Sequence, residues 1–521
     1  MTSPSPVIRR LSAAIAAIVA GVTLTACSSA IAGTASTDAS TVSVTSTATS
    51  ATTALADNVA SHAESGDLAY DADAAVTIPL ADGASTSSST SGVAIDGDTV
   101  TISAAGTYVL SGTLSDGRIV VASDADGTVK LVLDNASVTS SSGSAFVITA
   151  ADEAVVVLAD GTSNSLADGT GYDTSADDAP NAALFSMADL TIGGAGSLTV
   201  TGNTNDGIAS KDGLVILSGT ITVTAVDDGI RGKDYLIVAD GTLTVEAKDD
   251  GLKSDNETDD TVGYVLIKSG TVTLAAGDDG IHAEGDLAIQ GGKVTVSTSN
   301  EGLEGSTVTI AGGDTSVTST DDGLNATQGS TTDSAAAGGG GGMQSDGSLL
   351  TISGGTLLVN AQGDGLDSNG SLVITGGTTV VSGPTTSGNG ALDSNGGITM
   401  SGGTLVAAGS SGMAEAPSTD STTGWVSVTF AQAIAAGETV SIVKDGTVIA
   451  AYTTVKQVSS LIVADSDITS GQTYDVYVGG TLSGTAVGTY SDSGDLSGAT
   501  KNTTVTAGEH TSSGFGGGGH R

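Results

Sequence analysis

The chain of 521 residues carries 58 acidic and 15 basic side chains, which gives a formal charge of −43 at pH 7. This charge excludes nucleic acid as a partner, because binding a phosphate backbone requires clustered Lys and Arg. Only 3% of the residues are aromatic, whereas glycine supplies 76 of them. This composition argues against a core of large rings and favours a thin core of small β-branched residues in stacked layers.

The amino terminus is predicted to be an export signal. A pair of arginines precedes an alanine-rich apolar run at residues 11–22, which is too short for a stable membrane span. The sequence Leu-Thr-Ala-Cys at residues 24–27 resembles the lipobox of bacterial lipoproteins, in which the cysteine receives a lipid. The alternative is a chance cysteine behind a simple secretory signal. Cys27 is the only cysteine of the chain, so disulfides are excluded.

We therefore predict a lipoprotein signal peptide over residues 1–27. The mature protein is expected to be exported and held by lipid at Cys27 on the outer face of the bacterial cell membrane, at the cell surface. The membrane is a partner only through this anchor. Residues 28–72 are rich in Ser, Thr and Ala and have no hydrophobic period, which predicts a disordered stalk.

Short apolar runs separated by Gly, Asp and Asn begin near residue 76, as at residues 107–110, 118–121 and 129–133. Such runs are typical of strands joined by turns. Beyond residue 189 they come in pairs with a glycine turn between them, for example 214–216 followed by 221–223. Alternation within each run predicts one side chain inward and the next outward.

The sequence Asp-Asp-Gly-Ile/Leu, or a close variant, recurs between these pairs. Its copies occupy residues 205–208, 227–230, 249–252, 278–281, 300–303, 321–324 and, in weaker form, 363–366. The steps between their glycines are 22, 22, 29, 22, 21 and 42 residues, and the last step is long enough for two units. A period of roughly 20–25 residues is typical of a solenoid.

Three short strands in each unit, with Gly, Asp or Asn at the corners, describe a parallel β-helix. Leucine-rich repeats would need a helical segment, and helical repeats would need a period of about 3.6 residues. We therefore predict an all-β protein whose residues 73–410 form a parallel β-helix of coils about 22 residues long, with a flexible Gly-rich insertion at 328–347. Longer strands over 420–490 predict a small β-sandwich-like or capping module, followed by a flexible tail at 491–521.

The acidic residues of the motif are expected to stack in columns. Equivalent residues of successive coils lie about 4.8 Å apart, where two bare charges repel by roughly 0.9 kcal/mol in water and about 3.5 kcal/mol at an effective dielectric constant of 20. Either several carboxyl groups stay protonated or cations lie among them. The alternative is that each Asp-Gly pair only builds a corner, in which glycine adopts a positive φ and Asp caps the turn.

Calcium is the cation that this pattern favours, because it takes about six to eight oxygen ligands in flexible geometry. The scarcity of Cys and His disfavours zinc and copper. The predicted metal ligands are Asp206, Asp227, Asp228, Asp249, Asp250, Asp278, Asp279, Glu301, Asp321, Asp322 and Asp364.

The position after Ile or Leu in the motif is expected to face outward. It carries Arg231, Lys253 and His282 in three successive coils. These side chains are candidates to bind a sugar carboxylate, to act as the base of a lyase, or to neutralise the neighbouring acidic residues. Trp425, the only tryptophan, is expected in the core of the small module rather than as a sugar platform.

Residues 106–112 with 129–134, the Asp-Asp-Gly coils and residues 471–477 together resemble the bacterial carbohydrate-binding domain-containing proteins. The resemblance covers roughly residues 75–490. It implies a right-handed parallel β-helix similar in shape to pectate lyases, calcium at acidic coil positions, and affinity for plant-type polysaccharides, including acidic ones. It implies binding rather than catalysis, and no catalytic residue is carried over.

Three functions are thus open. The first is calcium-dependent binding of an acidic or cell-wall polysaccharide along one face of the β-helix. The second is a calcium-dependent polysaccharide lyase. The third is a non-catalytic structural or adhesive surface solenoid. We expect a polysaccharide partner and no enzymatic activity.

Overall fold

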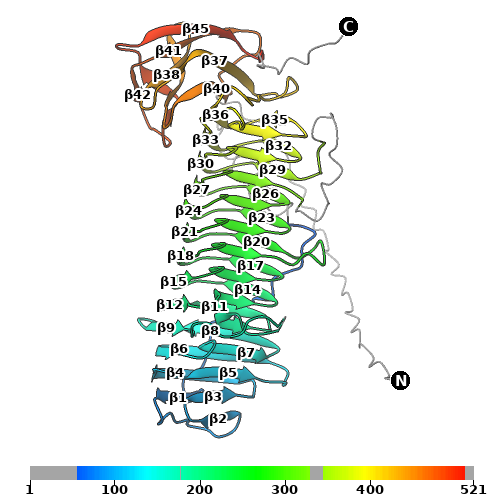
Figure 1. The fold of residues 1–521 in the computed structure, drawn as a ribbon, viewed down its shortest axis with the longest axis vertical. Coiled ribbons are helices and arrows are strands. Elements are labelled where there is room, and N and C mark those ends of the chain that lie inside the picture. The colour runs from blue at the N-terminus through cyan, green and yellow to red at the C-terminus, as the bar shows by residue number, and fades with distance from the viewer. Residues whose placement is uncertain (1–54, 177, 329–343, 511–521) are drawn as a thin grey trace, which may run out of the picture. The chain divides into compact units, whose positions relative to one another are not determined.

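Short parallel strands stacked coil on coil make up most of the protein (Figure 1). The computed structural model describes residues 55–176, 178–328 and 344–510. All of them belong to one compact unit, 43–521, whereas the other unit, 1–42, lies wholly outside the described residues. The predicted signal peptide, Cys27 and residues 28–54 of the predicted stalk therefore lie outside them as well. In the part described, no helix is long and apolar enough to cross a membrane.

A complete coil contains three strands, as in β13 (Asp206–Ser210), β14 (Gly213–Ile216) and β15 (Thr220–Ala225). The first belongs to a 13-stranded sheet and the other two to a 25-stranded sheet. Each strand pairs in parallel with its equivalent in the next coil, for example β13 with β16 (Ile230–Gly232). The predicted all-β fold and parallel β-helix are confirmed.

The 13-stranded sheet contains β2 (Val93–Asp96), β3 (Thr99–Ile102), β5 (Arg118–Ala122), β7 (Phe146–Ala150), β10 (Ala182–Ser186), β13, β16, β19 (Leu252–Ser254), β22 (Ile281–Ala283), β25 (Leu303–Gly305), β28 (Leu324–Ala326), β31 (Leu366–Ser368) and β34 (Leu392–Ser394). Its strands are parallel except for the antiparallel pair β2–β3 at the end.

The 25-stranded sheet takes one strand per coil from a first series: β1 (Val76–Ala81), β4 (Gly106–Leu114), β6 (Thr128–Thr139), β8 (Glu153–Leu158), β11 (Leu190–Gly194), β14, β17 (Tyr235–Val238), β20 (Tyr264–Ile267), β23 (Asp286–Ile289), β26 (Thr307–Ile310), β29 (Leu349–Ile352), β32 (Ser371–Ile374) and β35 (Ile398–Met400). A second series comprises β9 (Ser163–Ala167), β12 (Ser197–Gly202), β15, β18 (Thr242–Glu246), β21 (Thr271–Ala275), β24 (Lys293–Thr298), β27 (Asp314–Thr318), β30 (Thr356–Asn360), β33 (Thr378–Ser382) and β36 (Thr404–Gly409). Antiparallel β37 (Gly424–Ile434) and β40 (Val458–Asp465) complete the sheet.

The Ile or Leu of each motif copy lies in the core in register with the next, as Ile208 with Ile230 and Ile230 with Leu252. All of these side chains are fully buried. The motif glycines do not adopt the positive φ expected for a corner. A Cβ on Gly229 would instead lie 2.3 Å from Cγ1 of Val245, so glycine is required because the strands leave no room for a side chain.

The step of 42 residues holds one coil rather than the two that its length allowed. Leu324 of β28 pairs directly with Leu366 of β31, so no coil lies between them. The extra residues lie in the segment that joins β28 to β29. Most of the predicted insertion at 328–347 lies outside the described residues, because the structure leaves out 329–343.

Residues 55–69, within the segment predicted as a disordered stalk, instead lie against the outer face of the first-series strands, and we call them the strap. Its residue Val59 donates its N–H to Thr261 and accepts a hydrogen bond from the hydroxyl of Tyr264 (3.0 Å). Further along, Lys130 of β6 donates to the carbonyl of Ala69 at 2.5 Å. The strap, drawn in blue in Figure 1, thus runs against the direction in which the coils advance.

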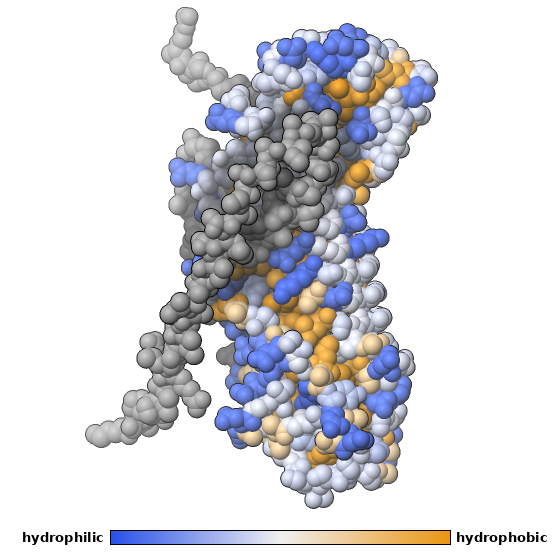
Figure 2. All heavy atoms as spheres, turned by 180° about the vertical axis from the view of Figure 1, so that it is seen from behind, coloured by the Kyte–Doolittle hydropathy of each residue, from blue (hydrophilic) through white to orange (hydrophobic). Residues whose placement is uncertain are grey.

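Apolar side chains on the outer face explain why the strap is ordered. Tyr235 and Tyr264 point outward from adjacent strands, and their rings stack with centroids 5.2 Å apart. They form an outer cluster with Ile237 and Leu266, against which Leu55 packs. Figure 2 shows that hydrophobic patches also reach the surface on the face opposite that of Figure 1. Burying apolar side chains stabilises the strap by about 25 cal/mol per Å² of apolar surface removed from water. The Ser/Thr/Ala composition of the segment does not reveal this stabilisation.

The C-terminal module closes the last coil and is longer than predicted. Its β40 pairs antiparallel with both β36 of the last coil and β37. A five-stranded antiparallel sheet packs with it, made of β43 (Tyr490–Ser491), β39 (Thr447–Thr453), β38 (Thr439–Lys444), β41 (Thr473–Val478) and β45 (Thr500–Thr506). β42 (Thr481–Ser483) pairs with β44 (Ser493–Asp495). The tail predicted over 491–521 is therefore wrong for residues 491–510, and 511–521 lie outside the described residues.

We predict that His62→Ala loosens the strap. His62 contacts the hydroxyls of Tyr235 (2.7 Å) and Thr191 (2.9 Å) through its two ring nitrogens, and losing such hydrogen bonds costs about 1 kcal/mol each. The expected result is faster proteolytic cleavage within residues 55–72 and a melting temperature lower by a few degrees. Asp73→Asn, which lies outside the strap, is the control, and equal cleavage of the two variants would contradict the prediction.

Candidate functional site

The corners of successive coils place two columns of polar side chains side by side. The inner column is the second acidic residue of each motif copy: Asp206, Asp228, Asp250, Asp279, Glu301, Asp322 and Asp364. The outer column is the residue after the buried Ile or Leu, paired in register from coil to coil: Arg231, Lys253, His282, Glu304, Asn325, Asp367 and Asp393.

In the inner column, aspartates cap the corners. The Oδ1 atom of Asp250 accepts the backbone N–H of Asp279 at 2.9 Å, and that of Asp322 accepts the N–H of Asp364 at 2.6 Å. This is the structural role that the corner interpretation predicted. Each cap uses one oxygen of the carboxyl group, and the other oxygen can contact side chains of the outer column.

Lys253 neutralises the inner column at its middle. Its Nζ lies 2.7 Å from Asp250, 3.3 Å from Asp228 and 3.7 Å from Asp249. Burial raises the pKa of Asp228 to about 7, against the opposing effect of Lys253. Burial lowers the pKa of Lys253, but the two buried aspartates outweigh it, so this pKa is raised.

Arg231 and His282 have similar partners in the adjacent coils. The guanidinium of Arg231 binds both carboxylate oxygens of Asp255 and lies 3.8 Å from Asp206. The Nδ1 atom of His282 lies 2.9 Å from Asp279 and 3.5 Å from Glu304. Burial lowers the pKa of His282, but the Asp279 hydrogen bond and nearby carboxylates raise it to about 9. All three predicted sugar contacts are thus ion-pair partners of carboxylates, and their role in binding sugar stays a prediction.

From Glu304 onward the outer column changes sign. Burial, with Glu301 close by, raises the pKa of Glu304 to about 8. Burial and the Asp322 carboxylate raise that of Asp367 to about 8, and burial with Asp393 raises that of Glu415 to about 7. No Lys or Arg forms an ion pair with these acidic residues in the described part of the chain.

This acidic stretch fits a hard cation by its donor atoms. The Oδ1 atom of Asn325 is buried and has no hydrogen-bond partner among the described residues, and Asn325 is in register with Asp367. A Cβ on Gly363 would lie 2.3 Å from Oδ1 of both Asp321 and Asp322, so these two oxygens lie close to each other against the backbone of Gly363. Carboxylate and amide oxygens are the ligands that calcium prefers.

Among the described residues, two groups of Asp, Glu and His side chains bring ligand atoms within 4.8 Å of one another; neither includes Asp321, Asp322 or Asp367, and each lies beside or contains a side-chain cation. Asp227, Asp228 and Asp249 meet beside Lys253, which contacts the latter two. The group of Asp279, His282 and Glu304 includes an imidazole, which suits transition metals better than calcium. Calcium binding at the corner therefore stays a prediction.

Sequence reasoning identified the corner but missed part of it. Of the predicted ligands, the inner column is buried or half-buried, whereas Asp278 and Asp321 are exposed. The missed residues are Glu304, Asn325, Asp367, Asp393 and Glu415. The first four occupy the register position that singled out Arg231, Lys253 and His282, so following that position through every coil would have found them.

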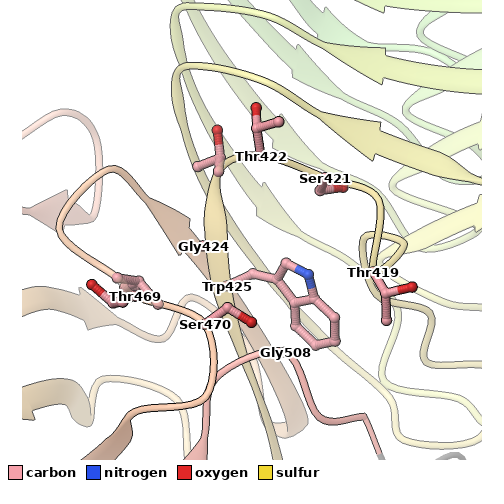
Figure 3. Close-up of a pocket in the computed structure, with 10 residues that line it drawn as sticks. Thr419, Ser421, Thr422, Gly424, Trp425, Thr469, Ser470 and Gly508 are labelled. Atoms are coloured by element: carbon pink, nitrogen blue, oxygen red, sulfur yellow. The ribbon is translucent and has the colours of Figure 1, made fainter.

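Trp425 lies in the core, but not in the core that was predicted. It is 4% exposed and belongs to the cluster that runs through the coils rather than to that of the module. It lines a cavity of about 300 Å³, in which Figure 3 shows its indole between Thr419 and Ser470. Its burial excludes a flat sugar platform.

Comparisons with known proteins show what this chain is similar to. Residues 96–348 match the family described as carbohydrate-binding domain-containing protein. A protein of that description from Acetivibrio thermocellus is 34% identical over 136 residues, 26% of this chain and 48% of the relative, so the match spans about half of that relative. A solved structure described as the polysaccharide lyase-like protein from C. thermocellum, gadolinium derivative, aligns at 31% identity with a TM-score of 0.39, over 46% of this chain and 93% of that one. The resemblance predicted from the sequence is confirmed for the coils within 96–348.

Removing the charge of Lys253 should destabilise the coils strongly. Lys253→Met would leave the buried carboxyl groups of Asp228 and Asp250 without a counter-charge, at a cost of about 3 kcal/mol. Chemical denaturation would measure the loss. Adding Asp250→Asn to the same variant should restore part of the stability, and a double variant no more stable than the single one would contradict this explanation.

The free energy of unfolding of the metal-free protein should fall as the pH rises from 5 to 8. Burial raises the pKa of Asp367 and Glu304 to about 8 in the folded protein, so between their unfolded and folded values the folded state binds more protons. His282 acts in the same direction, because its stabilising contribution is complete below its unfolded pKa and is lost as the pH rises through about 9. Calorimetry in EDTA would measure the trend. Asp367→Asn should flatten it, and a melting temperature that rises with pH would contradict it.

Proposed function

We propose that this protein is a cell-surface binder of an acidic polysaccharide and that calcium at the acidic stretch of the corner columns joins it to the sugar carboxylates. The single observation that carries the proposal is the change of sign in the outer column at Glu304. Before it, Arg231 and Lys253 neutralise the buried acidic residues. After it, the half-buried carboxyl groups of Asp322, Asp364, Asp367 and Asp393 form no ion pair with a Lys or Arg in the described part of the chain.

The calcium ligands would be Asp321, Asp322, Asn325 and Asp367. The Oδ1 atoms of Asp321 and Asp322 lie close to each other beside Gly363, and the Oδ1 acceptor of Asn325 has no hydrogen-bond partner among the described residues. When bound, the ion would supply positive charge that a polysaccharide carboxylate can share. The side chains of the protein hold the ion and keep the corner in register. A chain with a net charge of −43 otherwise repels an anionic polymer.

The match of residues 96–348 to a carbohydrate-binding family supports the choice of a glycan as the partner. Binding without turnover is favoured over lyase activity. A lyase needs a free base beside the sugar, but Arg231 is bound to Asp255, Lys253 contacts three aspartates, and His282 has its pKa raised to about 9, so it is protonated at neutral pH.

The location at the cell surface belongs to the same proposal. It is supported by the apolar run before the lipobox and by the single cysteine at position 27. Lipid on Cys27 would hold the coils where an extracellular polysaccharide can reach them. Radiolabelled palmitate incorporated into the wild type and absent from Cys27→Ala would support this part of the proposal.

The central experiment measures calcium and glycan binding together. Isothermal titration of the mature protein should show calcium binding, and polygalacturonate should bind in calcium and be released by EDTA. The double variant Asp322→Asn with Asp367→Asn should lose at least one calcium equivalent and most of the glycan affinity. Asp314→Asn, an exposed residue of β27, is the matched control.

Two outcomes would overturn this proposal. One is glycan binding that is unchanged in EDTA, which would remove calcium from the mechanism. The other is growth of the ultraviolet absorbance of unsaturated products from polygalacturonate, which would replace the binder by a lyase. An absence of polygalacturonate binding in calcium would favour a structural solenoid.

A further inference from the structure

A half-buried lysine of the C-terminal module lies in a polar cavity beside the last coils. Lys456 is in the turn between β39 and β40, and its Nζ donates to the carbonyl of Ala361, which follows β30. The cavity has a volume of about 210 Å³, and Asn360, Gln362 and Thr385 contribute to its wall. It therefore lies where the module meets the coils.

The charge of Lys456 has no carboxylate partner in the described part of the chain. Burial alone lowers its pKa to about 8, whereas Arg231, Lys253 and Lys501 all form ion pairs. The chain offers 58 acidic side chains as partners. Burying an uncompensated cation is costly, and this cost is recovered when an anion from outside supplies the missing charge.

The rest of the wall offers hydrogen-bonding groups without charge. The side chains of Asn360, Gln362, Thr385 and Thr386 line the cavity, and amides and hydroxyls both donate and accept hydrogen bonds. Pockets for drug-sized ligands measure about 300–1,000 Å³. This smaller cavity suits a single polar ring that carries hydroxyl groups.

We propose that this cavity binds a uronic acid unit of a polysaccharide, with the sugar carboxylate on the ammonium of Lys456 and the hydroxyls on Asn360 and Gln362. The inference rests on the proposed function and adds to it a contact that needs no calcium. Gln362 directly precedes Gly363, beside which the oxygens of Asp321 and Asp322 converge. Adjacent units of one acidic polysaccharide can thus reach both sites. The cavity includes residues beyond the family match at 96–348.

The test is the affinity of the mature protein for tetragalacturonate and for its methyl ester, measured by titration in calcium and in EDTA. Lys456→Gln should weaken tetragalacturonate binding about tenfold in both buffers, because a hydrogen bond to a charged group contributes about 1.5 kcal/mol or more. The methyl ester should bind the wild type weakly and be insensitive to the substitution. Lys456→Arg should keep most of the affinity.

Two further variants separate binding from folding. Lys444→Gln removes a lysine of the same module that contacts Gln472 and Thr473, and it should leave affinity unchanged. Gln362→Ala changes the coil side of the cavity without touching Lys456 and should weaken binding a few-fold. Equal losses for tetragalacturonate and its methyl ester in Lys456→Gln would mean a purely structural lysine and would overturn the inference.

The remaining outcomes distinguish this site from the calcium site. If Lys456→Gln keeps full calcium-dependent affinity, the inference that the cavity binds a uronic acid is overturned, and the proposed function stands. Binding that is independent of calcium and lost in Lys456→Gln would support the cavity and remove calcium from the function. No binding of tetragalacturonate by the wild type in either buffer would overturn both.

Discussion

Repulsion between like charges at the spacing of neighbouring strands is the constraint on which the corner depends. A parallel β-helix brings equivalent residues of successive coils to about 4.8 Å, so a repeat with an acidic residue at a fixed position builds a column of carboxyl groups. The protein meets this constraint in two ways. In the middle coils, Arg231, Lys253 and His282 supply counter-charge, and in the later coils the pKa of Asp322 and Asp367 is raised by burial.

The repeat made the fold predictable because one period fixes register, strand number and core at once. The motif glycine was predicted to be needed at the corner because of a positive φ. The structure gives another reason, since packing against Val245 and not φ excludes a side chain at Gly229. The step of 42 residues could not be assigned from length alone, because a loop and a second coil occupy similar numbers of residues.

The site was predicted in outline only. The motif showed which residues form the inner column. It did not show the partners of Lys253, because the side chain of Lys253 contacts aspartates of two different coils. Asp255, which binds Arg231, follows β19 in the coil that is longer than the period and has no repeat position to mark it. Composition also led to a wrong prediction of disorder for the strap. The few apolar residues that pack it against the coils, such as Leu55 and Leu68, are separated by polar residues.

The course of the strap has a mechanical consequence. The chain enters the coils near β20, where Val59 meets Tyr264, and only then runs back past β6 to the first strand, β1. Tension on the chain ahead of residue 55 is therefore applied to the side of the solenoid and not to its end. The contacts of Val59 and His62 would yield first, one after another, while the hydrogen-bonded coils stay unloaded. The strap can thus lengthen before the coils bear load, which protects their register.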